Sequence, residues 1–209
     1  MNASPKTARG RATRERIVDA TCELIGERGV AETSLDDVIE RAGASKSQLY
    51  HYFEDRAALL RGAVEHNSDE VLGGLVPLDG WKTIRTWFDS LVALQVERGA
   101  RRGCPIGSLV PQLAEADEPT RRALAESLAR WEAQLRDGLS SMQAKGKLSR
   151  RADPGELATA VLAAIQGGLL LTQARRDPGQ LATALDNAYA HLRTFAASPR
   201  RAVKPAAVR

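Results

Sequence analysis

The chain has 209 residues, of which 43% are hydrophobic, 27% are charged and only 4% are aromatic. This length fits one large domain or two small ones. The composition excludes a disordered acidic chain, a collagen-like repeat and a small disulfide-stapled protein. Cys22 and Cys104 lie far apart without a Cys-x-x-Cys motif, so neither a zinc ribbon nor a disulfide framework is expected. The polar N-terminus lacks the apolar core of a secretory signal, and we expect a soluble cytoplasmic protein.

Basic residues gather at the two ends of the chain. The net charge is +4, but residues 1–16 carry five basic residues against one acidic residue, and residues 198–209 carry four basic residues and no acid. The part between these ends is therefore acidic overall. We expect a flexible basic arm over residues 1–12 and a disordered basic tail over residues 198–209. Such segments either solubilise a protein or accompany a surface that binds a polyanion, and charge alone does not separate the two.

Apolar residues recur at intervals of three and four, which predicts an all-α fold of about nine helices. A first helix is expected to end at Gly29, and a short second helix enters through the Thr33-Ser34 pair and ends at Gly43. Ser45 opens a third helix, because Gln48 completes a Ser-x-x-Gln capping box. The short glycine-containing turn between the second and third helices is typical of a helix-turn-helix.

The third helix is expected to present a polar outer face, since Leu49 and Phe53 would pack inward. The outward residues are Lys46, Ser47, Gln48, Tyr50 and His51. Lysine and glutamine side chains can pair with guanine and adenine edges in the major groove, whereas tyrosine and histidine can contact phosphates. The alternative is a short polar helix whose aromatic cluster serves only the core. Spacing alone leaves both interpretations open.

The second half of the chain also predicts helices. One covers residues 81–95, a short one begins at Cys104-Pro105, a long one covers residues 124–139, and a last one covers residues 181–195. The uncharged stretch over residues 157–174 approaches the length of a membrane span. It is rich in alanine and glycine and contains threonine and glutamine, so we favour a helix buried between other helices.

The run from Thr13 to Leu60 closely resembles the DNA-binding domain of TetR-type transcriptional regulators. The sequence Leu49-Tyr50-His51-Tyr52-Phe53 matches the family's LYxxF-like ending, and Glu54 to Leu60 matches its polar hinge and fourth helix. The resemblance implies a helix-turn-helix domain over residues 13–60 and a helical effector-binding and dimerisation domain over residues 61–197. The segments GCPIGSLVPQLAE and IQGGLLL also resemble the family branch with an LmrA-like effector domain.

This resemblance further implies contacts to double-stranded operator DNA. The expected DNA-binding residues are Thr33, Ser45, Lys46, Ser47, Gln48, Tyr50, His51 and Arg56. Of these, Thr33 and Arg56 would contact phosphates from the starts of the second and fourth helices. Many relatives have a smaller residue at the position of Gln48, so the preferred base cannot be carried over.

The last two helices present more apolar surface than a monomer would leave exposed, which predicts a homodimer. Its two-fold symmetry would match a palindromic operator. The expected interface residues are Leu157, Val161, Ala164, Gly168, Leu171, Leu181, Leu185, Ala188 and Leu192.

The resemblance also implies a cavity for a small-molecule effector that releases DNA, as in a repressor. Its expected lining is Trp87, Phe88, Leu91, Gln95, Trp131 and Gln166. Simple core packing of these side chains is the alternative.

Three other functions remain open or are disfavoured. The chain could bind DNA constitutively without a ligand, or Cys104 could act as a redox or electrophile sensor near a helix N-terminus. An enzyme is disfavoured because no phosphate-binding loop, HExxH or GxSxG motif is present, so we expect no catalytic residues and no cofactor. His66 and His191 are isolated, and no metal site is expected.

Overall fold

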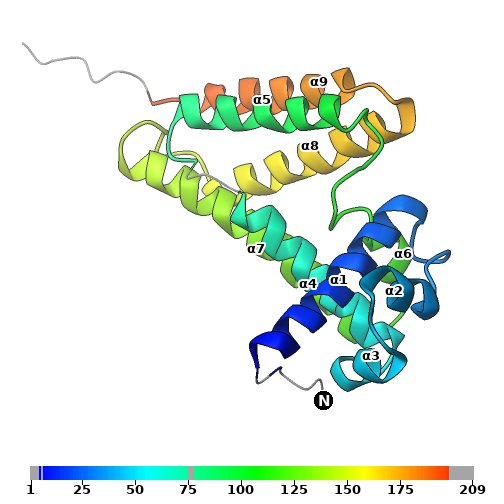
Figure 1. Ribbon diagram of the computed structural model, residues 1–209. Helices are drawn as coiled ribbons and strands as arrows, with labels where there is room; N and C mark the ends of the chain where they lie inside the picture. The colour runs from blue at the N-terminus through cyan, green and yellow to red at the C-terminus, as the bar shows by residue number, and fades with distance from the viewer. Residues whose placement is uncertain (1–4, 6, 75–77, 198–209) are drawn as a thin grey trace, which may run out of the picture.

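The computed structural model describes residues 5, 7–74 and 78–197, and these residues form nine α-helices (Figure 1). In chain order the helices are α1 (Ala8–Arg28), α2 (Leu35–Ala42), α3 (Lys46–Tyr52), α4 (Arg56–Gly73), α5 (Trp81–Glu97), α6 (Val110–Leu113), α7 (Glu118–Ala144), α8 (Pro154–Arg175) and α9 (Gly179–Thr194). The all-α prediction is confirmed. The tail expected at 198–209, with residues 1–4 and 6 of the expected arm, lies outside the described residues.

The helices form two lobes (Figure 1). The smaller lobe, here called the head, consists of α1, α2, α3 and the first half of α4. Its core contains Ile17, Leu49 and Phe53, each fully buried. As the sequence predicts, α2 ends at Gly43, whose φ of 57° is left-handed, and α3 begins directly after the cap Ser45. The head is therefore a helix-turn-helix held against α1 and α4.

The larger lobe, here called the body, consists of α5, α7, α8, α9 and the second half of α4. Helix α8 packs against α7 and α9, and α5 packs against α9. Helix α8 is long and apolar enough to cross a membrane, and 44% of its most apolar window is buried inside the protein. Leu157, Val161 and Ile165 of α8 belong to the body core, which accounts for much of this apolar character.

The structure corrects two expected boundaries. Helix α1 begins at Ala8 because the Thr7 hydroxyl accepts a hydrogen bond from the Gly10 N–H at 3.0 Å, so residues 8–12 are helical. The expected boundary at residue 60 falls inside α4. Leu60 and Val64 pack with residues of α6 and α7, which makes α4 continuous between head and body.

A third correction concerns the helix expected to begin at Cys104-Pro105. These residues instead enter a turn, and α6 begins only at Val110. The Cys104 Sγ accepts a hydrogen bond from the Gly107 N–H at 3.2 Å, which closes the turn. A Cβ at Gly107 would lie 2.1 Å from the Gln166 Oε1, so glycine allows this loop to lie directly on α8.

Candidate nucleic-acid interface and body cavities

The capping box predicted for the third helix is present. The Gln48 N–H donates to the Ser45 Oγ at 3.2 Å, and the Ser45 N–H donates to the Gln48 Oε1 at 2.8 Å. These two bonds satisfy free backbone donors at the start of α3. The box also changes what Gln48 can do, because a two-bond pair with adenine needs both the amide oxygen and the amide N–H. In this geometry the side-chain N–H donors are free, whereas the amide oxygen already accepts one hydrogen bond from the Ser45 N–H.

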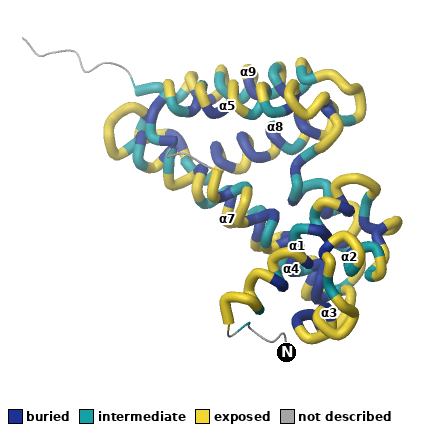
Figure 2. The backbone as a smooth tube through the Cα atoms, viewed as in Figure 1, coloured by how far each residue is buried: buried dark blue, intermediate teal, exposed yellow. Residues whose placement is uncertain are grey.

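The outer face of α3 is exposed as expected (Figure 2). Lys46, Ser47, Gln48, Tyr50 and His51 are all exposed, and Tyr50 keeps 46% of its surface accessible. A large aromatic side chain so accessible on a short helix is suited to contact with another molecule. The next two residues, Tyr52 and Phe53, are buried in the head core. The aromatic cluster is therefore divided between an outer face and the core.

Thr33 does not lie where a phosphate contact requires it. Its side chain is buried, at 4% exposure, and its hydroxyl donates to the Gly29 carbonyl at 2.8 Å. Its N–H donates to the Val30 carbonyl at 3.3 Å. The exposed hydroxyl at the start of α2 belongs instead to Ser34, which caps that helix by accepting from the Asp37 N–H. Sequence reasoning could not choose between two adjacent hydroxyl residues before the same helix.

Arg56 is exposed at the start of α4, but its guanidinium is partly engaged. The Nη2 donates to the carbonyls of Val30 at 2.6 Å and Thr33 at 2.9 Å. An arginine has five N–H donors, so the Nη1 and Nε donors remain for a phosphate. Arg56 thus orders the segment between α1 and α2 and still offers donors to a polyanion.

The first turns of α1 extend this surface. Arg9, Arg11 and Arg16 are exposed, and within the described part of the chain they form no ion pair. A Cβ at Gly10 would lie 3.2 Å from the Tyr52 hydroxyl, so the start of α1 lies beside the end of α3. These arginines are therefore ordered on a helix next to the recognition face, and two of them, Arg9 and Arg11, lie where the sequence predicted a flexible arm.

Arginine side chains neutralise several acids of the head. Arg41 of α2 lies 3.2 Å from Glu23 and 3.1 Å from Glu27, and hydrogen bonds from Arg41 lower the pKa of Glu27. Hydrogen bonds from Ser34, together with Arg28, lower the pKa of Asp37. Arg9, Arg11, Arg16 and Lys46 form no such ion pair with the described residues and stay available to phosphates.

The residues expected to bind an effector lie in the body core. Trp87, Phe88, Gln95 and Trp131 are buried, whereas Leu91 and Gln166 are partly buried. The side-chain amide of Gln166 already has a partner, because its Nε2 donates to the Cys104 Sγ at 3.4 Å. A void of about 10 Å³ lies in this core, too small for any ligand in this conformation. Its lining is Leu78, Ile84, Trp87, Phe88, Leu135, Leu139, Val161 and Leu192.

Two buried polar atoms of α5 and α7 lack partners among the described residues. The Gln95 Oε1 and the Trp131 Nε1 are buried and form no hydrogen bond with the described residues. Neither residue lines the void: Gln95 lies two turns of α5 from Phe88, and Trp131 lies one turn of α7 from Leu135, on the same helix faces as these lining residues. A buried donor or acceptor without a partner is costly, and these two call for a bound water or ligand.

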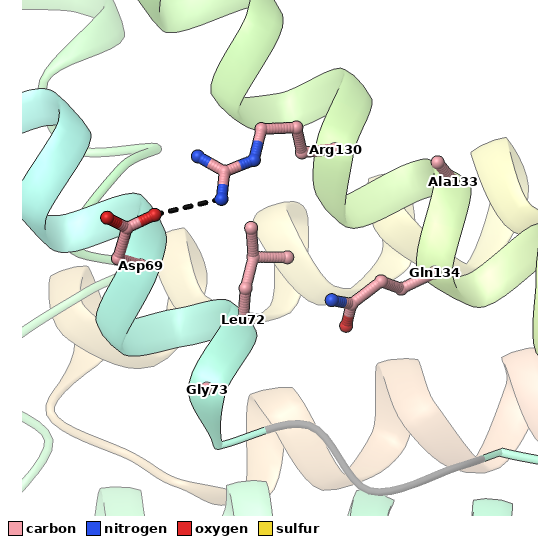
Figure 3. Close-up of a pocket in the computed structure, with 6 residues that line it drawn as sticks. All are labelled: Asp69, Leu72, Gly73, Arg130, Ala133 and Gln134. Atoms are coloured by element: carbon pink, nitrogen blue, oxygen red, sulfur yellow. Dashed lines mark hydrogen bonds and ion pairs between the residues drawn. The ribbon is translucent and has the colours of Figure 1, made fainter.

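A surface pocket of about 500 Å³ opens between α4 and α7 (Figure 3). Its lining is Asp69, Leu72, Gly73, Arg130, Ala133 and Gln134. The Arg130 guanidinium spans the two helices and lies 2.8 Å from Asp69. Leu72 points between the helices and also belongs to the body core that contains Trp131. Leu72 therefore separates solvent in this pocket from the core.

A larger cleft, of about 690 Å³, separates head and body, and both acidic and basic side chains line it. Burial and neighbouring acids raise the pKa of Cys22, which lines this cleft, to about 12, so its thiol stays protonated.

Cys104 is 4% exposed and lies outside any helix. The helix N-terminus that motivated the sensor hypothesis is therefore absent. No group of residues suited to a metal ion is found in the described ranges, which include His66 and His191.

The structure also corrects the expected dimer interface. The following residues are buried inside one protomer, where α8 packs against α7 and α9: Leu157, Val161, Gly168, Leu181, Leu185 and Leu192. Ala164 and Ala188 are partly buried, and Leu171 is 43% exposed. A Cβ at Gly168 would lie only 2.8 Å from the Leu181 Cδ1, so this glycine faces α9 of its own chain. These buried residues cannot form a surface for a partner.

The opposite side of α8 is exposed and has small side chains. Ala160, Ala163, Gly167, Leu170 and Ala174 follow one another at intervals of three and four and are all exposed. Leu170 is 67% accessible. On α9 the exposed residues include Thr183, Asn187, Ala190 and Thr194. These residues are here called the outer α8–α9 face. Unlike the buried residues expected in the interface, they form an accessible and largely uncharged surface.

Known proteins resemble the chain over both lobes. A family model for bacterial regulatory proteins of the tetR family matches residues 17–63, and one for a tetracyclin repressor-like C-terminal domain matches residues 80–188. An HTH-type transcriptional regulator from the lacX 3' region of Lactococcus lactis is 29% identical over 170 residues, covering 77% of this chain and 83% of that protein. The HTH-type transcriptional regulator LmrA of Bacillus subtilis is 27% identical over 172 residues, covering 77% of this chain and 86% of LmrA.

Solved structures share the fold. The regulatory protein TetR from Rhodobacter sphaeroides superposes with a TM-score of 0.72 at 24% identity, covering 86% of this chain and 98% of that chain. The arrangement of an N-terminal helix-turn-helix head on a helical body is therefore shared with this structure.

Proposed function

Because the chain belongs to the TetR family of helix-turn-helix transcriptional regulators, which are not enzymes, we propose that it is a cytoplasmic repressor that binds a palindromic operator as a homodimer and is released by a small-molecule effector. The observation that carries DNA binding is the exposed outer face of α3 with the arginines of α1 beside it. Selection of bound duplexes from a random pool tests this directly. An inverted repeat is the expected result.

Within α3, reading and positioning are assigned to different residues. Lys46 and Gln48 lie at the N-terminal end, which enters the major groove in helix-turn-helix proteins, and Tyr50 lies one turn later, toward the backbone. Replacing Tyr50 with phenylalanine removes only the hydroxyl, so affinity is expected to fall by a similar factor on every operator variant. The variant Gln48→Glu keeps the oxygen that accepts from the Ser45 N–H and loses the amide donor. We expect it to change the preferred base at one position.

Binding titrations against a set of single-base operator variants check both expectations. Replacing Gln48 with alanine is a poorer choice, because it also removes the capping bond. The assignment is reversed if Tyr50→Phe changes the preference at one position and Gln48→Glu weakens all sequences equally.

The basic start of α1 is expected to contribute through charge. Each phosphate that a protein neutralises adds about −0.9 to the slope of log affinity against log salt. Replacing Arg9 and Arg11 with glutamine should therefore make the slope shallower by up to about 2, with no change in the preferred sequence. Replacing Arg150 and Arg151, two exposed arginines of the body, is the matched control and should leave the slope unchanged. A changed base preference would show that α1 reads bases.

The two unpartnered atoms support an effector site in the body core. We assign the effector as an apolar molecule with one hydrogen-bond donor for the Gln95 Oε1 and one acceptor for the Trp131 Nε1. Because the void in this conformation holds about 10 Å³, binding must move the lining helices. The pocket beside Leu72 offers a route from solvent into this core.

Replacing Gln95 with leucine is expected to stabilise the free protein by about 1 kcal/mol, because a buried acceptor without a partner is removed. Urea unfolding measures this change. The same variant should lose any response of operator affinity to a panel of small hydrophobic compounds. A wild-type protein whose operator affinity no compound changes would instead be a constitutive DNA-binding protein.

A further inference from the structure

The side chain of Gln112 in α6 holds the segment between α1 and α2 from outside the head. Its Oε1 accepts a hydrogen bond from the Val30 N–H at 2.9 Å, and its Nε2 donates to the Ser108 carbonyl at 2.7 Å. Val30 is buried, so its N–H would lose its partner if the Gln112 amide were removed. Gln112, 82 positions away along the chain, therefore provides the hydrogen-bond acceptor for a backbone N–H of the head.

The carbonyl of the same residue is held from the other side. The Arg56 Nη2 donates to the Val30 carbonyl at 2.6 Å and to the Thr33 carbonyl at 2.9 Å. Thr33 directly precedes Ser34, the capping residue of α2. Val30 is thus fixed at its N–H by α6 and at its carbonyl by the first residue of α4.

Apolar packing joins the same three elements. The side chain of Val30 packs in one cluster with Ile25 of α1, Leu60 of α4 and Leu113 of α6. Gly29 adopts a φ of 86°, and a Cβ there would lie 3.2 Å from the Gln112 Oε1, so glycine both permits the turn and leaves room for the amide. A displacement of α6 cannot leave Val30 unaffected, because a hydrogen bond and a packed core connect them.

We propose that Gln112 is a positioning residue for DNA binding: through Val30 it holds Arg56 and the start of α2 in the geometry that contacts phosphates. This inference rests on the proposed DNA binding. The Arg56 Nη2 donates to the two carbonyls, so the Nη1 and Nε donors of Arg56 are held in a defined direction. Without Gln112 the turn gains freedom that binding to DNA must remove again, which lowers affinity without removing any DNA contact.

The test uses the full-length protein and a duplex that the wild-type protein selects from a random pool. The variant Gln112→Met keeps the length of the side chain and removes its amide. We expect an affinity about five-fold lower, the effect of one neutral hydrogen bond, and faster amide exchange at the start of α2. The variant Gln112→Glu keeps an oxygen that can accept from the Val30 N–H, so it should retain most of the affinity.

The matched control is Gln143→Met, in the body. The Gln143 Nε2 also makes two hydrogen bonds to backbone carbonyls, at 2.9 Å to Ser149 and at 2.9 Å to Ala152. Its replacement should leave DNA affinity unchanged. A double-mutant cycle adds a readout that general destabilisation would not move. Because Gln112 and Arg56 act through the same residue, the combined loss of Gln112→Met and Arg56→Met should be smaller than the product of the single losses.

Two results overturn the inference: a Gln112→Met variant that binds the duplex as the wild type does, or single losses that multiply independently. A wild-type protein that selects no duplex overturns the proposed function instead. In that case amide exchange at the start of α2 still decides whether Gln112 orders the head.

Discussion

Replacing Gly167 with arginine is expected to give a folded monomer that binds its operator far more weakly. Gly167 lies in the middle of the outer α8–α9 face, and a Cβ built there would meet nothing within 4 Å, so its own protomer accommodates a side chain. In a two-fold dimer through this face the same residue of both protomers enters one interface. A guanidinium buried there without a partner costs several kcal/mol, which is enough to separate the subunits.

Sedimentation velocity measures the change in mass, and circular dichroism checks that the helices remain. Loss of the second head removes simultaneous binding to both half-sites, so operator affinity should fall on the order of 100-fold or more. The variant Gly167→Ala is the matched control and should stay dimeric. A Gly167→Arg protein that still sediments as a dimer would place the interface elsewhere on the body.

Replacing the next residue, Gly168, with valine is expected to destabilise the fold of each protomer. A Cβ at Gly168 would lie 2.8 Å from the Leu181 Cδ1, 3.1 Å from the Ala184 Cβ and 3.2 Å from the Leu181 Cα. The last of these is backbone, so α8 and α9 must move apart. Overpacking of this kind costs up to about 3 kcal/mol, and a protein of this size would lose roughly 6–12 °C in Tm.

Urea unfolding of Gly168→Val beside Gly167→Val tests the packing of α8. A Cβ at Gly167 meets no atom of its own chain, so valine there should change the free energy of unfolding of the single chain by less than about 0.5 kcal/mol. Equal stability of the two variants would contradict the α8–α9 contact. Substitutions at these two adjacent glycines therefore test separate properties: Gly167 tests assembly and Gly168 tests folding.

Local sequence patterns are sufficient to predict the helices and the helix-turn-helix motif. Apolar spacing predicted the all-α fold, and Gly43 with the Ser45–Gln48 pair predicted the helix-turn-helix, because caps and turns depend on residues within four positions of one another. The same local rules predicted an outer face on α3 that includes Tyr50. The start of α1 is different: Thr7 caps this helix, but it stands among basic residues that favour the prediction of a flexible arm.

The partner that each apolar or polar side chain contacts depends on the packing of the folded chain. Helix α8 is apolar nearly all round, so its sequence pattern cannot distinguish the face buried against α9 from the face left outside. That is why the sequence pattern predicts Leu157 and Val161 of α8 in a dimer interface, although they lie in the core. The Thr33 hydroxyl is directed inward by the Gly29 carbonyl, and Arg56 is held by the carbonyls of Val30 and Thr33. The N–H of Val30 in turn depends on Gln112, far away in the chain. Periodicity shows that a side chain is buried or exposed, but contacts between distant segments follow only from the packed chain.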